Sequence, residues 1–179
     1  MLNLLVRDLS CYNNSILFSV DISLPLAVDE LNDSIQEMLS NGQKICEDSL
    51  PHQEWAIHDY EWEEESLFSI SEFDDIYELN KRISYIQGKV QSDQLKILKF
   101  LLENFGMDLE TAIDNIENVN VYEDCDLEDV VEQYLEDCYN LDDLPSIISS
   151  NIDYESIAND WRISGQFFEI DSDVYEYIG

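Results

Sequence analysis

The sequence predicts an α+β fold, and two patterns lead to this prediction. Near both ends of the chain, short segments of alternating or continuous apolar residues are typical of β-strands. Between them, apolar residues recur at the spacing of amphipathic helices. We therefore expect an N-terminal three-stranded antiparallel sheet with a helix, a central helical segment, and a C-terminal small sheet with helices.

Three strands are expected in an N-terminal α+β domain, residues 1–66. Leu2–Val6 is a short apolar run, and Ile16–Ser23 alternates apolar and polar residues until Pro25 ends it. Glu54–Trp62 is also strand-like and would complete the antiparallel sheet. Strict alternation along this third strand predicts one face with Trp55, Ile57 and Asp59 and another with Ala56, His58 and Tyr60.

The same domain should contain one helix that begins near Asp29. Asn41-Gly42 is expected to end it, because glycine is favoured just after a helix, and Gln43–His52 then reads as a polar loop. The connection between the first two strands is expected to be a turn at Cys11–Asn14, where asparagine tolerates a positive φ. The buried face of the helix is predicted from the apolar residues Leu31, Ile35, Met38 and Leu39.

A central helical domain is expected over residues 67–118. Its first helix would be capped by Asp74 or Asp75 and interrupted at Gly88. Ser92 is expected to cap a second helix over Leu95–Asn104, and Asp108 a short third one. Five of the eight basic residues lie in this domain, between 81 and 99, and we interpret them as partners of nearby acids in preference to a separate binding patch: Lys81, Arg82, Lys89, Lys96 and Lys99.

Residues 119–179 are expected to form a C-terminal α+β domain. Val119–Tyr122 should be a strand, and Phe167–Ile170 and Val174–Ile178 should form two more around a turn. Leu144-Pro145 opens a helical turn, and Asp153–Trp161 is predicted to be a helix.

The most acidic part of this domain is Glu123–Asp143, in which ten of 21 residues are Asp or Glu and none is Lys or Arg. Asp126 stands where a helix N-cap is expected. One face of the predicted helix is apolar, with Leu127, Val130, Val131, Tyr134, Leu135 and Cys138. The opposite face carries Glu128, Glu132 and Glu136 at a spacing of four residues. Like charges at this spacing destabilise a helix, so the pattern indicates a surface whose function requires negative charge.

The whole chain has 41 acidic residues against 8 basic ones, a formal charge of −33. Duplex DNA carries about two charges per base pair, so this equals the charge of about 16 base pairs. Such a chain should bind neither nucleic acid directly nor anionic membranes, and it favours a basic protein partner. With no signal peptide and no apolar run long enough for a membrane span, we expect a cytoplasmic protein of a bacterial host.

The sequence predicts no catalytic residue, no cofactor and no metal site. The four cysteines form no CxxC pair and are expected to be reduced thiols, in preference to a zinc site. His58 has Glu54 nearby but no second histidine beside it, and Asp124-x-Asp126-x-Glu128 departs from a calcium loop at later positions. No nucleotide-binding or hydrolase motif occurs. We therefore expect a protein that is not an enzyme, with a carboxylate metalloenzyme as the least supported alternative.

Charge, a folded core and the shortage of bases outside 81–99 together suggest a DNA mimic. The alternative is an acidic adaptor or chaperone that binds basic nucleoid or DNA-binding proteins without DNA-shaped geometry. The two differ because a mimic needs carboxylates at fixed places. The candidate partner-binding residues are Glu61, Glu63, Glu64, Glu65, Asp74, Asp75, Asp124, Asp126, Glu128, Asp129, Glu132, Glu136, Asp137, Asp142 and Asp143.

Several segments, in order along the chain, resemble the ArdA family of antirestriction proteins. They are CYNNSILFSVDISLP at Cys11–Pro25, QEWAIHDYE at Gln53–Glu61, IYELNKR at Ile76–Arg82, Tyr122–Pro145, and NIDYESIANDWRISGQF at Asn151–Phe167. AIHDYE is the most specific of them. The chain departs from the family pattern at Ser15, Ser19 and Asp21, where glycines and a tryptophan are usual. It also departs near Tyr139-Asn140, where the family often has small residues and glycine.

The resemblance implies an elongated, curved molecule of three small domains that dimerises through the C-terminal one. It also implies a non-enzymatic inhibitor that occupies the DNA-binding groove of type I restriction–modification enzymes and so protects incoming mobile-element or phage DNA. The family's antirestriction segment would fall around Val131–Pro145.

Overall fold

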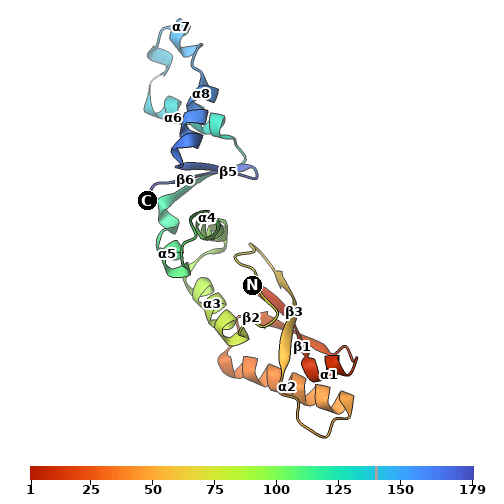
Figure 1. The fold of residues 1–179 in the computed structure, drawn as a ribbon. Helices are drawn as coiled ribbons and strands as arrows, with labels where there is room; N and C mark the ends of the chain where they lie inside the picture. Colours follow the sequence, from red (N-terminus) through yellow and green to blue (C-terminus); the bar gives the residue numbers. More distant parts are fainter. Residues whose placement is uncertain (140) are drawn as a thin grey trace. The chain divides into compact units, whose positions relative to one another are not determined.

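The structure, a computed structural model, describes residues 1–139 and 141–179, except for the side chain of Asp142. It confirms the α+β class and divides into two compact units, Met1–Glu103 and Asn104–Gly179 (Figure 1). The finer division into domains 1–66, 67–118 and 119–179 stays a prediction. No helix within the described residues is both long and apolar enough to cross a membrane.

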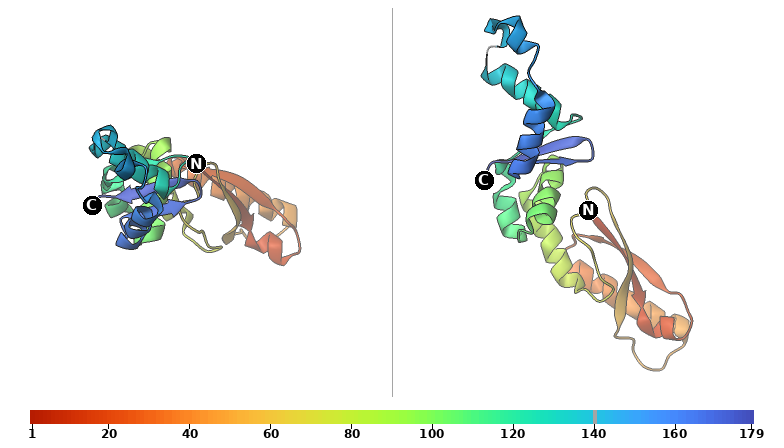
Figure 2. Two further views of the ribbon diagram at one scale, coloured as in Figure 1. Left: turned by 90° about the horizontal axis from the view of Figure 1, so that it is seen from above. Right: turned by 45° about the horizontal axis from the view of Figure 1, so that its top comes forward.

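The first unit is built on the expected three-stranded antiparallel sheet. Its strands are β1 (Leu2–Asp8), β2 (Ser19–Leu24) and β3 (Trp55–Trp62), in the order β2-β1-β3. Helix α2 (Val28–Cys46) runs along one face of this sheet, as the orange helix in Figure 2 shows. The predicted apolar residues of α2 are buried there in one core with alternate residues of β1: Leu2, Leu4, Val6, Leu31, Ile35, Met38 and Leu39.

Strand β3 contains a β-bulge that the sequence pattern did not reveal. Val6 pairs with Ile57 and Leu4 with Tyr60, so two steps along β1 match three steps along β3. His58 is the extra residue, and alternation shifts by one position after it. The prediction of uninterrupted alternation is therefore wrong: Ile57 and Tyr60 share the core side of the sheet.

Two predictions around the first helices are also wrong. Cys11–Asn14 is not a simple turn, because Leu9–Asn13 forms the short helix α1, and the positive φ falls on Ser15 instead. Gly42 does not end α2, which continues to Cys46. This glycine is buried, and an added Cβ would overlap the carboxylate of Asp8. Its role is therefore to permit a close approach between α2 and the end of β1.

The helices that follow largely agree with the sequence. Helix α3 (Ile76–Lys89) is capped by Asp75, continues one residue past Gly88, and is followed by the 3-10 turn η1 (Ser92–Gln94) and α4 (Leu95–Phe105). The expected cap at Ser92 is wrong, because Gln91 and Gln94 form the capping box.

The basic residues of this region form contacts within the unit. Lys81 pairs with Glu78, Lys99 lies 3.2 Å from Glu65, and the guanidinium of Arg82 lies 3.8 Å from the centre of the Phe68 ring. These contacts support the interpretation of the bases as intramolecular partners.

The second unit carries its own three-stranded antiparallel sheet. Strands β4 (Val119–Tyr122), β5 (Phe167–Ile170) and β6 (Asp173–Tyr177) are arranged in the order β4-β6-β5. The helical elements are α5 (Leu109–Asp114, capped by Asp108), η2 (Ile116–Asn118), α6 (Leu127–Cys138), η3 (Leu141–Asp143), α7 (Ser146–Ser149) and α8 (Tyr154–Ser164). Helices α6 and α8 pack with the sheet around one core: Leu127, Val130, Val131, Ala158, Phe167 and Val174.

Candidate partner-binding surface

Helix α6 presents the predicted acidic stripe. Asp126 caps the helix by accepting a hydrogen bond from the backbone N of Asp129 at 3.0 Å. The buried residues of α6 fix its orientation, so the opposite face is directed outward. Glu128, Glu132 and Glu136 are all exposed. Glu132 and Glu136 make no hydrogen bond or salt bridge to any residue that the structure describes.

The basic residue that acts electrostatically on the first glutamate of the stripe comes from another helix. Arg162, on α8, donates from Nε to Oε2 of Glu169 at 2.6 Å. This hydrogen bond raises the pKa of Arg162, and the negative charge of Glu128 raises it further. The salt-bridge partner of Arg162 is Glu169, and the three glutamates of the stripe form no salt bridge with the residues that the structure describes.

The remaining candidate residues of the second unit lie on or beside α6. Asp124, Asp126, Asp129, Asp137 and Asp143 are exposed, whereas the side chain of Asp142 lies outside what the structure describes. Asp126 serves as the helix cap, and the backbone N of Asp124 donates to Asp173 at 3.1 Å.

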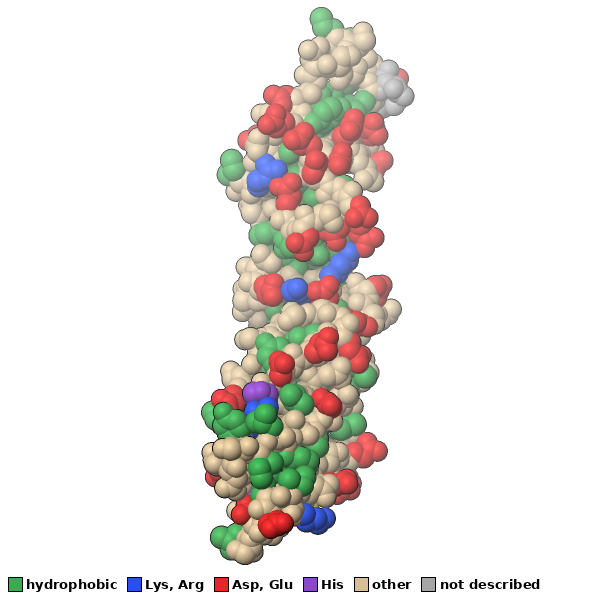
Figure 3. Space-filling view, turned by 90° about the vertical axis from the view of Figure 1, so that its right-hand side faces the viewer, with side chains coloured by type: hydrophobic (Ala, Val, Ile, Leu, Met, Phe, Trp, Pro, Cys, Tyr) green, Lys and Arg blue, Asp and Glu red, His purple; other side chains and the backbone are tan. Residues whose placement is uncertain are grey.

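The candidate residues of the first unit are partly engaged in structure. Glu63 lies 3.6 Å from the N-terminal amine, Glu64 accepts from Ser92 at 3.3 Å, and Glu65 pairs with Lys99. The carboxylate of Asp75 caps α3, and Asp74 accepts from a backbone N at 2.9 Å. Glu61, Glu63 and Glu64 are nevertheless exposed. Figure 3 shows many Asp and Glu side chains on the face in view and few Lys or Arg.

An apolar surface follows the acidic stripe at the end of α6. The sequence predicted a buried face through Cys138, but Tyr134 is 47% exposed and Cys138 is exposed. The apolar face continues past the end of the core packing and lines a shallow depression of about 560 Å³. We call this the distal apolar surface, formed by Leu135, Cys138, Tyr139, Leu141, Leu144, Ile148 and Ile152.

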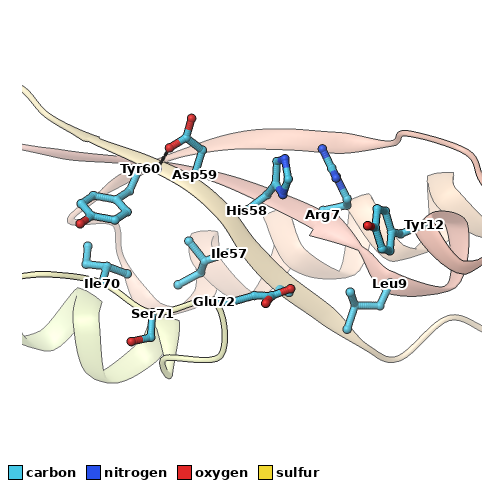
Figure 4. A pocket seen from close by; sticks show the side chains of 11 residues that line it. Arg7, Leu9, Tyr12, Ile57, His58, Asp59, Tyr60, Ile70, Ser71 and Glu72 are labelled. Atoms are coloured by element: carbon cyan, nitrogen blue, oxygen red, sulfur yellow. Dashed lines mark hydrogen bonds between the residues drawn. The ribbon is translucent and has the colours of Figure 1, made fainter.

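The first unit has a pocket of about 350 Å³ against β3, drawn in Figure 4. His58, which the sequence does not favour as a metal ligand, lines this pocket together with Arg7 and Tyr12. The guanidinium of Arg7 lies 5.3 Å from the centre of the Tyr12 ring. Asp59 accepts a hydrogen bond from the backbone N of Tyr60 at 2.9 Å, drawn as a dashed line in Figure 4.

The sequence did not single out one buried polar group of the first unit, which is centred on His52. His52 is buried, and its Nδ1 lies 2.6 Å from Oδ2 of Asp8 while its Nε2 lies 2.8 Å from Oδ2 of Asp48. Burial alone would lower the pKa of His52, but the hydrogen bonds to the two carboxylates outweigh it and raise the pKa. Beside this histidine, Cys11 and Cys46 are joined in a disulfide, which corrects the prediction of four reduced thiols; Cys125 and Cys138 are free.

A family model described as antirestriction protein (ArdA) matches residues 4–176, nearly the whole chain. A search of curated proteins gives no match to the chain. The family match agrees with the sequence segments that resemble this family at both ends of the chain. The chain belongs to the ArdA family of antirestriction proteins, and this membership implies an antirestriction function through interaction with restriction–modification enzymes.

Proposed function

We propose that the protein inhibits a type I restriction–modification enzyme by occupying its DNA-binding groove as a mimic of DNA. It acts by binding and not by catalysis, and it protects incoming mobile-element or phage DNA in the bacterial cytoplasm. The observation that carries the proposal is the exposed stripe on α6, where Glu132 and Glu136 have no partner among the described residues.

The spacing and amount of charge support this mechanism. Residues four apart on a helix are separated by about 6 Å along its axis, so the stripe is a row of regularly spaced negative charges. The whole chain, with 41 acids against 8 bases, supplies a long-range negative field. A groove lined with Lys and Arg to bind phosphates would attract such a surface and release counter-ions on binding, as it does with DNA.

We further propose that the protein acts as a homodimer joined through the distal apolar surface. Ile147 is 77% exposed and Ile148 52% exposed in the single chain, beside the depression at the end of α6. Contiguous exposed apolar side chains of this kind are typical of protein interfaces. A second copy is the occupant that we favour, because two-fold pairing would also double the length of the charged surface.

The dimer proposal is tested by light scattering at physiological salt. Ile148→Glu is expected to convert the dimer to a monomer, because it puts a charge into the apolar contact. Ile163→Glu is the matched control, since Ile163 is 84% exposed on α8 and does not line the depression. Equal masses for the two variants and the unaltered protein would contradict the proposed interface.

The mimic proposal is tested by competition with DNA. A short duplex that carries the recognition sequence of a type I enzyme should displace the protein from that enzyme, and the protein should displace the duplex. Both complexes should weaken as salt rises, because both depend on the same basic groove. A stable ternary complex of enzyme, duplex and protein would contradict occupation of the groove.

A further inference from the structure

We propose that Cys11, Cys46, Asp48 and His52 form a binding site for one Zn²⁺ ion when the two cysteines are reduced. The site belongs to the first unit, does not involve the acidic stripe, and goes beyond the proposed function. Its donors come from α1, from the last residue of α2 and from the loop before β3.

The donor atoms are already close together. Those of Cys46, Asp48 and His52 lie within 4.8 Å of one another, and so do those of Asp8, Cys11 and His52. The Cα atoms of the two cysteines are 6.1 Å apart. Two thiolates, one imidazole nitrogen and one carboxylate oxygen suit a tetrahedral zinc site, with bonds of about 2.0–2.3 Å. The two sulfur ligands favour Zn²⁺ over Mg²⁺ or Ca²⁺, which prefer oxygen.

His52 is oriented for metal binding by Asp8. Oδ1 of Asp8 accepts from the backbone N of Ser10 and of Cys11, at 2.9 and 3.1 Å, which fixes the carboxylate at the start of α1. Oδ2 is then directed at Nδ1 of His52. A carboxylate that holds one imidazole nitrogen leaves the other to bind the metal. Asp8 is therefore a positioning residue, and Nε2 is the zinc-binding atom.

Burial and access are both suitable. Asp8, Cys11 and His52 are buried, so their positions are fixed by packing. The side chain of Asp48 is 38% exposed, which gives an ion a route from solvent. Gly42 allows α2 to lie against Asp8 and Cys11, so a larger residue there would separate the donors.

The disulfide and the zinc site are two states of the same cysteine pair. A dithiol reductant transfers two electrons and two protons to the Cys11–Cys46 bond, giving two thiols while the dithiol itself becomes a disulfide. Zn²⁺ then binds the thiolates as the two thiol protons leave to solvent. The oxidised pair offers no thiolate, so it should not bind the metal.

The test uses the full chain, reduced without oxygen and titrated with Co²⁺ as a spectroscopic substitute for Zn²⁺. We expect one ion per chain with a thiolate-to-cobalt charge-transfer band, which Zn²⁺ abolishes by displacing Co²⁺. Adventitious binding to surface carboxylates cannot produce this band, because it requires sulfur ligands. The oxidised chain should show no band. If the reduced, unaltered protein shows no such band, that result alone overturns the proposal, and no variant is needed.

Site-resolved alkylation identifies the ligands. In the reduced chain, Zn²⁺ should protect Cys11 and Cys46 from alkylation and leave the exposed Cys138 reactive. Cys46→Ser should lose the charge-transfer band, whereas Cys138→Ser, the matched control, should keep it. Asp8→Asn, which can still cap α1, should weaken Zn²⁺ binding roughly 10–100-fold, as expected for a residue that orients a ligand. Protection of Cys125 and Cys138 in place of the other pair would also overturn the proposal.

Discussion

Arg162 and Glu169 form a hydrogen-bonded salt bridge that connects the end of α8 to β5, with Nε donating to Oε2 at 2.6 Å. Oε1 of the same Glu169 accepts from the backbone N of Leu127 at 3.3 Å, at the first residue of α6. One carboxylate thus links three elements beneath the acidic stripe. Its state of ionisation should therefore affect the stability of the surface that we propose binds the target.

The pH dependence of this link is the first prediction. The hydrogen bond from Arg162 lowers the pKa of Glu169 in the folded protein. A lowered folded pKa stabilises the protein above the unfolded pKa of about 4.3, and the stabilisation is lost as pH falls through the folded value. Glu169→Gln should therefore lower Tm at pH 7, and the difference from the unaltered protein should shrink below about pH 4. Glu136→Gln is the control and should leave Tm at pH 7 unchanged or slightly higher. A constant Glu169→Gln effect across this range would exclude the ionised pair as its cause.

The second prediction concerns two helical glycines with opposite surroundings. Gly42→Ala should destabilise the protein by about 1–3 kcal/mol, because the new Cβ would overlap the Asp8 carboxylate and lie 3.2 Å from Sγ of Cys11. Gly88→Ala should stabilise by about 0.5–1 kcal/mol, because nothing lies within 4 Å of its added Cβ and alanine favours a helix. Urea unfolding measures both. Similar effects of the two substitutions would contradict the close approach at Gly42.

The third prediction concerns salt and the stability of the whole chain. With a formal charge of −33, repulsion opposes folding, and salt screens it. Tm should rise as ionic strength increases from about 10 to 200 mM, over which the Debye length falls from about 30 Å to below 10 Å. A Tm that is flat or falls over this range would mean that attractive pairs balance the repulsion.

Local signals allowed most of the fold to be predicted from the sequence. The caps at Asp75, Asp108 and Asp126 are formed within three residues of the helix that each begins, so sequence spacing reveals them. The buried residues at the start of α6 could also be predicted, because helical periodicity depends only on the spacing of neighbouring residues in the sequence.

The features that were missed depend on contacts between distant segments. The bulge at His58 is defined by pairing with β1, and Gly42 is constrained by Asp8, which lies 34 positions earlier in the sequence. The group around His52 gathers side chains from α1, α2 and a loop, at spacings that match no metal motif. The exposure of Tyr134 depends on where the core ends and not on periodicity.

The acidic stripe provides the fourth prediction and the test of the DNA-mimic account. Replacing Glu128, Glu132 and Glu136 by Gln removes three charges from one row and should leave α6 folded, because like-charge repulsion is relieved. The matched control replaces three exposed acids outside the candidate surface, Asp33 by Asn and Glu37 and Glu54 by Gln. Asp48 is unsuitable as a control, because it contacts His52.

Inhibition constants of the two triple variants against a type I restriction enzyme at fixed salt are the deciding measurement. If the protein is a DNA mimic, the stripe variant should be a weaker inhibitor than the control. The reason is that the carboxylates of the stripe occupy the positions that DNA phosphates would take in the groove. The loss should be partial, since many acids remain. An acidic adaptor that acts by charge alone predicts equal constants, and equality within error would contradict the account.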